Sequence, residues 1–267
     1  MRRSPSIDQG RSFDWGKTSG DYAAHRPGPP PGFYDRLALL GVGGPGRRIL
    51  DLGTGTGLLA REFARRGAKV SGIDVAPGQI ETARRLAAAE GLRADFKVAP
   101  AEAIPFPDAC FDAVSANQCW LYFDKRRAIP EVIRVLKPGG LLAVSHFSYL
   151  ARRSEIARRS ERLVLRSNPD WTAADDPCDV PPMPSWAKLR FDLRAMFWYD
   201  EPVRFTRASW AGRMRACRGV GAELSPEELR RFDAEHRKLL ARIAPPAFGV
   251  LHRVDAHILE PKGPSGP

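Results

Sequence analysis

The stretch Ile49–Ala60, with the sequence ILDLGTGTGLLA, decides the fold of this chain. Its first four residues, three apolar and one acidic, are typical of the end of a buried strand. Three glycines at alternate positions, Gly53, Gly55 and Gly57, then predict a tight turn into an apolar helix. Glycine suits such a turn because it adopts positive φ angles and lets a ligand approach the backbone. The stretch therefore predicts a strand, a ligand-binding turn and a helix.

Strand and helix patterns alternate along the chain on both sides of this turn. The sequence predicts strands at 68–73, 96–99, 111–115 and 141–146, and helices at 58–66, 77–90 and 125–136. Alternation of this kind favours an α/β fold with a parallel, doubly wound sheet. Farther on we expect helices at 151–167, 207–219 and 225–243, and strands at 191–205 and 249–259.

The spacing of the glycines indicates which kind of ligand the turn binds. A dinucleotide-binding turn reads G-x-G-x-x-G, whereas this turn reads G-x-G-x-G and is less suited to a diphosphate. Asp51 precedes the turn, and a second acid, Asp74, follows Gly57 by 17 residues at the end of the next strand. This pattern resembles motif I of the class I S-adenosylmethionine (SAM) methyltransferases.

Two further segments resemble the same family, in its UbiE-like and trans-aconitate methyltransferase-like branch. They are the Tyr-x-x-x-Arg-Pro run from Tyr22 to Pro27 and the RVLKPGG segment at 134–140. The resemblance implies a Rossmann-like sheet of seven strands with an antiparallel last strand, helical additions on the acceptor side, and SAM as the cofactor. It also implies that the chain is an enzyme that transfers methyl groups.

The resemblance further implies a division of the chain. Residues 1–32 would form an N-terminal arm and residues 33–267 the methyltransferase domain, with an acceptor-side insertion at about 151–245. In the family the arm closes over the cofactor. We therefore expect residues 17–32 to act as a lid that can be removed without loss of the fold.

SAM requires space for its methionine part, acceptors for its ribose hydroxyls and a slot for adenine. A carboxylate at a strand end, such as Asp74, can accept hydrogen bonds from both ribose hydroxyls. Pro100 stands where the family often has an aspartate for the adenine amino group, so we expect the backbone of the next residues to face adenine. The predicted cofactor-binding residues are Tyr22, Arg26, Asp51, Gly53, Thr54, Gly55, Thr56, Gly57, Asp74, Val75, Ala101, Glu102, Asn117 and Gln118.

The sulfonium of SAM is already activated, so alignment and desolvation can supply much of the catalysis. A base is needed only for an acceptor that enters protonated, and the candidates are His146 and His25. The histidine common in the family's Trp-His-Trp-Phe run is Leu121 here. Predicted acceptor contacts are Trp120, Arg213 and Arg218, because arginines can bind a carboxylate or phosphate.

Composition narrows the class of protein. The 267 residues include four cysteines and no C-x-x-C pair, which indicates free thiols in a reducing compartment. No apolar run approaches the roughly 20 residues of a membrane span. We therefore expect a cytoplasmic monomer or homodimer, without a metal and without membrane contact.

The net charge of +11 raises the question of an anionic partner. The excess of positive charge is mostly scattered arginine, which favours a solvated surface over a nucleic-acid face. The main prediction is therefore a small-molecule methyl acceptor, either neutral or anionic. Two alternatives stay open at this point: a nucleic-acid methyltransferase, and a SAM-binding cyclase that transfers no methyl group.

Overall fold

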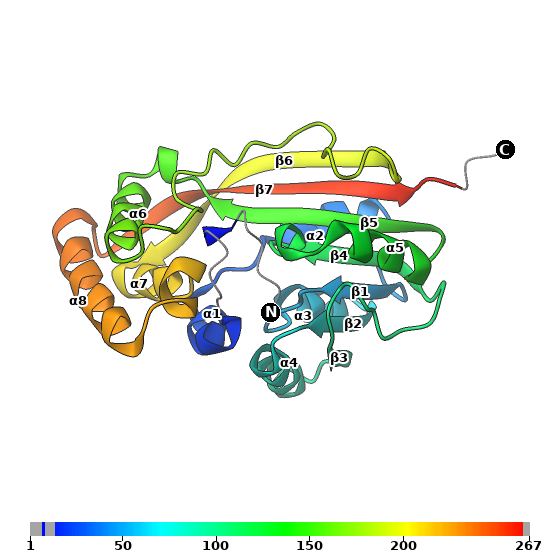
Figure 1. Cartoon of the computed structure of the whole chain (residues 1–267), viewed down its shortest axis with the longest axis horizontal. Helices are drawn as coiled ribbons and strands as arrows, with labels where there is room; N and C mark the ends of the chain where they lie inside the picture. Colours follow the sequence, from blue (N-terminus) through cyan, green and yellow to red (C-terminus); the bar gives the residue numbers. More distant parts are fainter. Residues whose placement is uncertain (1–6, 9–13, 264–267) are drawn as a thin grey trace. The chain divides into compact units, whose positions relative to one another are not determined.

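The computed structural model describes residues 7–8 and 14–263. In these residues a seven-stranded sheet has the order β3-β2-β1-β4-β5-β7-β6 (Figure 1). The strands are β1 Arg48–Leu52, β2 Lys69–Asp74, β3 Ala94–Val98, β4 Phe111–Asn117, β5 Leu136–Tyr149, β6 Phe191–Thr206 and β7 Ala247–Pro261. Strands β3, β2, β1, β4 and β5 pair in parallel, and β7 runs antiparallel. The predicted fold class is confirmed.

The chain divides into two compact units, and each is described by itself. The glycine-turn unit consists of residues 28–147, 180–199 and 254–267. The helical unit consists of residues 1–27, 148–179 and 200–253. The described part of the predicted arm up to residue 27 thus belongs to the same unit as most of the predicted insertion.

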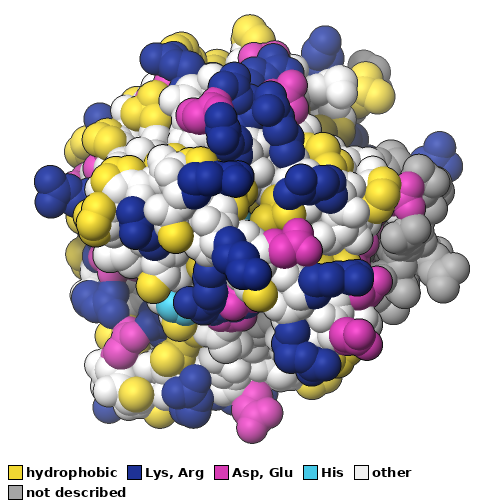
Figure 2. Space-filling view, turned by 90° about the vertical axis from the view of Figure 1, so that its left-hand side faces the viewer, with side chains coloured by type: hydrophobic (Ala, Val, Ile, Leu, Met, Phe, Trp, Pro, Cys, Tyr) yellow, Lys and Arg dark blue, Asp and Glu magenta, His cyan; other side chains and the backbone are white. Residues whose placement is uncertain are grey.

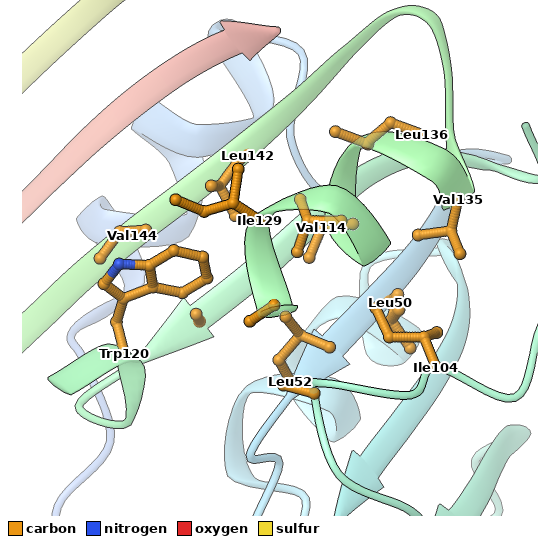
Figure 3. Packing of buried hydrophobic residues seen from close by; sticks show 14 of the residues in the cluster. Leu50, Leu52, Ile104, Val114, Trp120, Ile129, Val135, Leu136, Leu142 and Val144 are labelled. Atoms are coloured by element: carbon orange, nitrogen blue, oxygen red, sulfur yellow. The ribbon is translucent and has the colours of Figure 1, made fainter. Parts of the chain in front are cut away.

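The glycine-turn unit contains the buried part of the parallel sheet. Its helices are α2 Pro31–Leu39, α3 Leu58–Arg65, α4 Pro77–Ala89 and α5 Lys125–Val135. Leu50, Leu52, Val114 and Leu142 are fully buried and pack in one cluster (Figure 3). Parallel strands covered on both faces have such continuous apolar runs. Because β1 pairs in parallel with β2 and β4, the carboxyl ends of these three strands lie at the same edge of the sheet.

The helical unit has a core of its own around Trp210, whose side chain is fully buried. Its helices are α1 Ser19–His25, α6 Glu155–Ser167, α7 Arg207–Arg215 and α8 Pro226–Ile243. Short helical turns lie at Trp15–Thr18, Ala151–Arg153 and Arg218–Ala222, and at Trp120–Tyr122 in the glycine-turn unit. Ser225 and Glu228 form a capping box at the start of α8.

Several predicted boundaries differ from the structure: the helix predicted at 151–167, for example, begins at Glu155, after a short helical turn. Two of the differences have a clear cause. Strand β5 begins at Leu136, directly after α5, and not at residue 141, because Leu136 already pairs with Phe111 of β4 and a register irregularity follows. Helix α7 ends at Arg215 and not at residue 219, because Cys217 is extended (φ −72°, ψ 150°).

Basic side chains are spread over the helical unit. Figure 2 shows a face on which Lys and Arg side chains stand among acidic, apolar and other groups and do not join into a single block. Within residues 7–8 and 14–263, no helix combines the length and the apolar character that a bilayer span requires. The same residues contain no cluster of three or more His, Cys, Asp or Glu side chains arranged to hold a metal ion.

Candidate functional site

The glycine turn has the conformation that its sequence predicts. Gly53, Gly55 and Gly57 have φ angles of +56°, +56° and +75°, in the left-handed region that favours glycine. A Cβ atom at Gly53 would lie 2.8 Å from the Cβ of Cys119, and one at Gly57 would lie 3.0 Å from the Phe96 ring. Glycine is therefore required by backbone conformation at all three positions and by close packing at two.

Asp51 supports the turn from within the sheet. Its side chain is only 2% exposed and accepts hydrogen bonds from the hydroxyls of Thr54 and Ser115, both at 2.7 Å. Burial raises the pKa of the Asp51 carboxyl to about 6, although the two hydroxyl donors act in the opposite direction. Thr56, also in the turn, is fully buried. Asp51, a predicted cofactor contact, thus holds the shape of the turn.

Asp74 organises the outer side of the turn from the carboxyl end of β2. One carboxylate oxygen accepts the amide of Gly55 at 3.0 Å and the other accepts the amide of Ala76 at 2.9 Å. The amide of Thr54 donates to the carbonyl of Ile73 at 2.9 Å, which ties the turn to β2. Burial raises the pKa of Asp74, and these amides lower it. Each Asp74 oxygen keeps a further lone pair for a ligand hydroxyl.

The predicted adenine and methionine contacts lie at the ends of the neighbouring strands. Ala101 is buried, and the Glu102 carboxylate accepts the amide of Asp124, the N-cap of α5, at 2.8 Å. The Asn117 side chain accepts from Ser145 at 3.1 Å. Val75 is exposed beside Asp74.

Gln118, at the end of β4, has a left-handed backbone. Its φ angle is +62°, which is uncommon for a residue with a side chain. The side-chain amide donates to the carbonyl of Phe147 at 2.6 Å, and the backbone amide donates to the carbonyl of Ser145 at 3.0 Å. Strain of this kind is often concentrated at functional sites.

His146 is held in one orientation by a partner in the last strand. Its Nδ1 lies 2.9 Å from Oδ1 of Asp255, which is buried, while the His146 side chain is 40% exposed. A carboxylate at Nδ1 favours the tautomer with its proton there and leaves Nε2 as the basic nitrogen. The sequence predicted His146 but missed Asp255, because 109 residues separate the two and no local motif marks the aspartate.

Trp120 is a core residue. Its indole is 3% exposed, lies 4.7 Å from the ring of Trp186, and belongs to the same cluster as Val144 and Ile129 (Figure 3). The predicted acceptor contact is not supported, because no appreciable surface of this side chain is accessible to a ligand.

In the helical unit, helix α1 of the predicted arm packs against helix α7. Arg215 of α7 binds Asp21 of α1 through two hydrogen bonds of 3.0 and 2.8 Å. The ring of His25 lies against Gly212, where a Cβ atom would come within 2.0 Å of it. Removing α1 would leave the Arg215 charge without this partner, so the structure does not support an arm that can be removed without cost. Its closure as a lid stays a prediction.

The predicted acceptor arginines differ sharply. The Arg218 guanidinium is 7% exposed and is bound by Asp8, with a bond of 2.9 Å to Asp8 Oδ1 and a second to Asp8 Oδ2. The prediction that Arg218 contacts the acceptor is therefore not supported, since it is already neutralised by a buried carboxylate. Arg213 is 5% exposed and donates to the sulfur of Cys217 at 3.1 Å.

This sheet order, with a glycine-rich turn after β1 and an acid at the end of β2, is the fold of the Rossmann-like methyltransferases. A family model described as a methyltransferase domain matches residues 49–140. Residues 49–140 thus match a methyltransferase domain, and the chain is similar to class I SAM-dependent methyltransferases of the UbiE-like type, a family whose cofactor is SAM.

Known proteins similar to this chain agree with the family. A demethylmenaquinone methyltransferase from Thermus thermophilus is 49% identical over 38% of this chain and 47% of its own length. The ubiquinone/menaquinone biosynthesis C-methyltransferase UbiE from Geobacter sulfurreducens is 38% identical over 43% of this chain and 46% of its own. The chain thus spans about half the length of the curated relatives it matches.

The similarity in fold extends farther than the similarity in sequence. A solved structure of a protein assigned as a type II methyltransferase from Anaeromyxobacter dehalogenans superposes with a TM-score of 0.58. It covers 88% of this chain and 96% of that protein, at 22% identity.

Proposed function

We propose that this chain is a methyltransferase that moves the methyl group of SAM to a small-molecule acceptor by in-line displacement. The observation that carries the proposal is the glycine turn with Asp74, whose two oxygens hold the amides of Gly55 and Ala76 at the carboxyl edge of the sheet. This edge is where open α/β sheets bind ligands. The names of the relatives, which contain menaquinone and ubiquinone, support a small-molecule acceptor.

The residues present fit SAM. The turn has no side chains at Gly53, Gly55 and Gly57, so the methionine part can approach the backbone closely. The Asp74 carboxylate accepts the ribose hydroxyls, and the backbone around Ala101 faces adenine. SAM itself supplies the activated methyl group, while the chain binds, orients and excludes water.

Titration calorimetry with SAM tests the donor site. Gly55→Val and Asp74→Ala should each weaken SAM affinity about tenfold or more, because they remove close approach and a charged hydrogen bond of about 1.5–3 kcal/mol. Asp95→Ala, an exposed aspartate on β3, is the matched control and should bind SAM as the wild type does. Wild-type affinity in both site variants would remove the basis of the proposal.

His146 is the proposed base where the acceptor enters protonated. Asp255 holds its Nδ1, so Nε2 takes the acceptor proton as the methyl group is transferred. His25 is less suited, because its Nε2 lies 3.8 Å from Asp21 without a hydrogen bond.

Production of S-adenosylhomocysteine from a panel of phenolic, amine and carboxylate acceptors tests the base. His146→Gln should lower turnover about 100-fold or more with a protonated acceptor and leave SAM affinity unchanged. His257→Gln, on the same strand as Asp255, is the control. Equal turnover in His146→Gln and the wild type would exclude His146 as the base.

A cytoplasmic location completes the proposal, since all four cysteines are free thiols. We further propose that nucleic acid is not the acceptor, because the basic side chains on the face in Figure 2 are interspersed with acidic ones.

A further inference from the structure

A cavity of about 940 Å³ lies at the amino edge of the parallel sheet, within the glycine-turn unit. The glycine turn and Asp74 lie at the carboxyl ends of the same strands. Along β2, the step from Lys69 to Asp74 is about 16 Å, at about 3.3 Å per residue. The cavity is therefore separate from the donor site. Its lining includes the first residue of each of four strands, β1 to β4: Arg48, Lys69, Ala94 and Phe111.

The charged side chains that line the cavity are mostly basic. Among the described lining residues, Asp95 is the single acid, and its carboxylate lies 3.2 Å from Nζ of Lys97, outside the lining. The cavity therefore keeps an excess of positive charge, and a cleft lined by one sign of charge concentrates ligands of the opposite sign. Its cations are Arg48, Lys69, Arg84 and Arg93.

Three of these cations form a row across neighbouring strands. Strands β3, β2 and β1 lie side by side in the sheet (Figure 1). Arg48 of β1 is the register partner of Lys69 of β2. Arg93 directly precedes Ala94, the register partner of Val70, so it is level with Lys69. Because adjacent strands are about 4.8 Å apart, the row spans about 10 Å. Like charges this close repel one another, and a bound chain of anionic groups would relieve that repulsion.

The nearby helix ends do not account for the cations. Helices α3 and α4 end at this edge, and the partial negative charge of a helix C-terminus attracts basic side chains. However, the backbone amides of residues 66–68 already donate to the last carbonyls of α3, and those of residues 90–92 donate to the last carbonyls of α4. Both ends are thus closed by the chain's own backbone.

The four cations keep donors for a ligand. Nε of Arg48 and one Nη of Arg84 each donate to a backbone carbonyl, which leaves the other N–H groups of both guanidiniums. In the part of the chain that the structure describes, the side chains of Lys69 and Arg93 have neither a hydrogen-bond partner nor an ion-pair partner.

We propose that this cavity binds a small polyphosphate, whose chain of phosphate groups lies across the starts of β1, β2 and β3. Guanidinium and ammonium groups bind phosphate oxygens through charge-assisted hydrogen bonds. A chain of several phosphates matches a row of cations better than a single anion does. The volume of the cavity also suits a small molecule, since such sites have about 300–1,000 Å³. The site is independent of the donor site and of the methyl acceptor.

Titration calorimetry with inorganic tripolyphosphate at constant ionic strength tests the inference on the full chain. Tripolyphosphate should bind saturably, with one molecule per chain. The double variant Lys69→Gln and Arg93→Gln should bind it about tenfold or more weakly, because two charged hydrogen-bond donors are lost. The double variant Arg85→Gln and Arg127→Gln removes two charges from exposed positions of the same unit, outside the cavity, and should bind as the wild type does. Both variants should keep the wild-type midpoint of urea unfolding.

The other outcomes overturn the inference or assign the source of the polyphosphate. Absence of saturable binding, or equal affinity in the wild type and the Lys69 and Arg93 variant, would overturn it. An equal loss in the control variant would also overturn it, because binding would then follow net charge alone. Tighter binding of a short DNA duplex than of tripolyphosphate would exclude a small ligand. Adenosine triphosphate distinguishes the sources: if it binds more tightly than tripolyphosphate and loses affinity in the same variant, the ligand is a nucleoside polyphosphate, and otherwise it is inorganic polyphosphate.

Discussion

The glycine turn and the arginine segment Ser209–Gly219 differ in where their polar partners come from. In the turn, Asp51 and Asp74 accept hydrogen bonds from residues in or next to strands β1, β2 and β4. In the arginine segment, Arg215 binds Asp21 and Arg218 binds Asp8, 194 and 210 residues away. The turn can thus be interpreted from a short sequence motif, whereas identical arginines acquire different roles only through distant partners.

The largest effect that separates the arginines should appear in the free energy of unfolding. Arg218→Met should lose about 3–5 kcal/mol, because it leaves the fully buried Asp8 carboxylate without its cation. Arg213→Met should lose little or nothing without ligand, because it removes a charge that has no carboxylate partner within residues 7–8 and 14–263. Urea unfolding at pH 7 measures both. Equal losses in the two variants would show that Arg213 is neutralised within the chain.

A smaller effect, the pH dependence of the free energy of unfolding, should distinguish the two units. The pKa of Asp51 is about 6 in the fold and 3.8 for the free group, so its contribution to stability is complete below pH 3.8 and lost as pH rises to about 6. The pKa of His236 in the helical unit is about 4, against 6.5, so its contribution is complete above pH 6.5 and lost as pH falls to about 4. The two windows overlap, but their slopes have opposite signs.

Variants can separate these slopes. Relative to the wild type, Asp51→Asn should gain stability as pH rises from 4 to 6, and His236→Gln should gain stability as pH falls from 6.5 to 4. The free energy of unfolding, measured by urea from pH 4 to pH 8, checks both. Parallel profiles for the two variants and the wild type would contradict the assignment of opposite signs.

The fold class and the conformation of the glycine turn could be predicted because the signals are local. Three alternating glycines, an acid before them and an acid at the next strand end lie within 24 residues of sequence, from Asp51 to Asp74. The cap of α8 at Ser225 is equally local, since its partner is three residues away.

The partners of the other predicted site residues could not be predicted, because they lie far away in the sequence and no local pattern indicates them. Trp120 was predicted to contact the acceptor, but the sequence cannot say that its ring would pack against Trp186, 66 positions farther on. The partner of His146 lies in the last strand, and the partner of Arg218 lies near the start of the chain. In each case a side chain was recognised but its neutralising or covering partner was not.

The contact between His25 and Gly212 depends on the absence of an atom. Any Cβ at position 212 would overlap the imidazole ring, with the nearest approach at 2.0 Å, so this position can gain a side chain only if position 25 loses its ring. The two positions should therefore behave as a correlated pair during divergence: a small residue at 25 would permit alanine or serine at 212. A compensating double change of this kind in related sequences would show that the packing of helix α1 against helix α7 was retained during evolution.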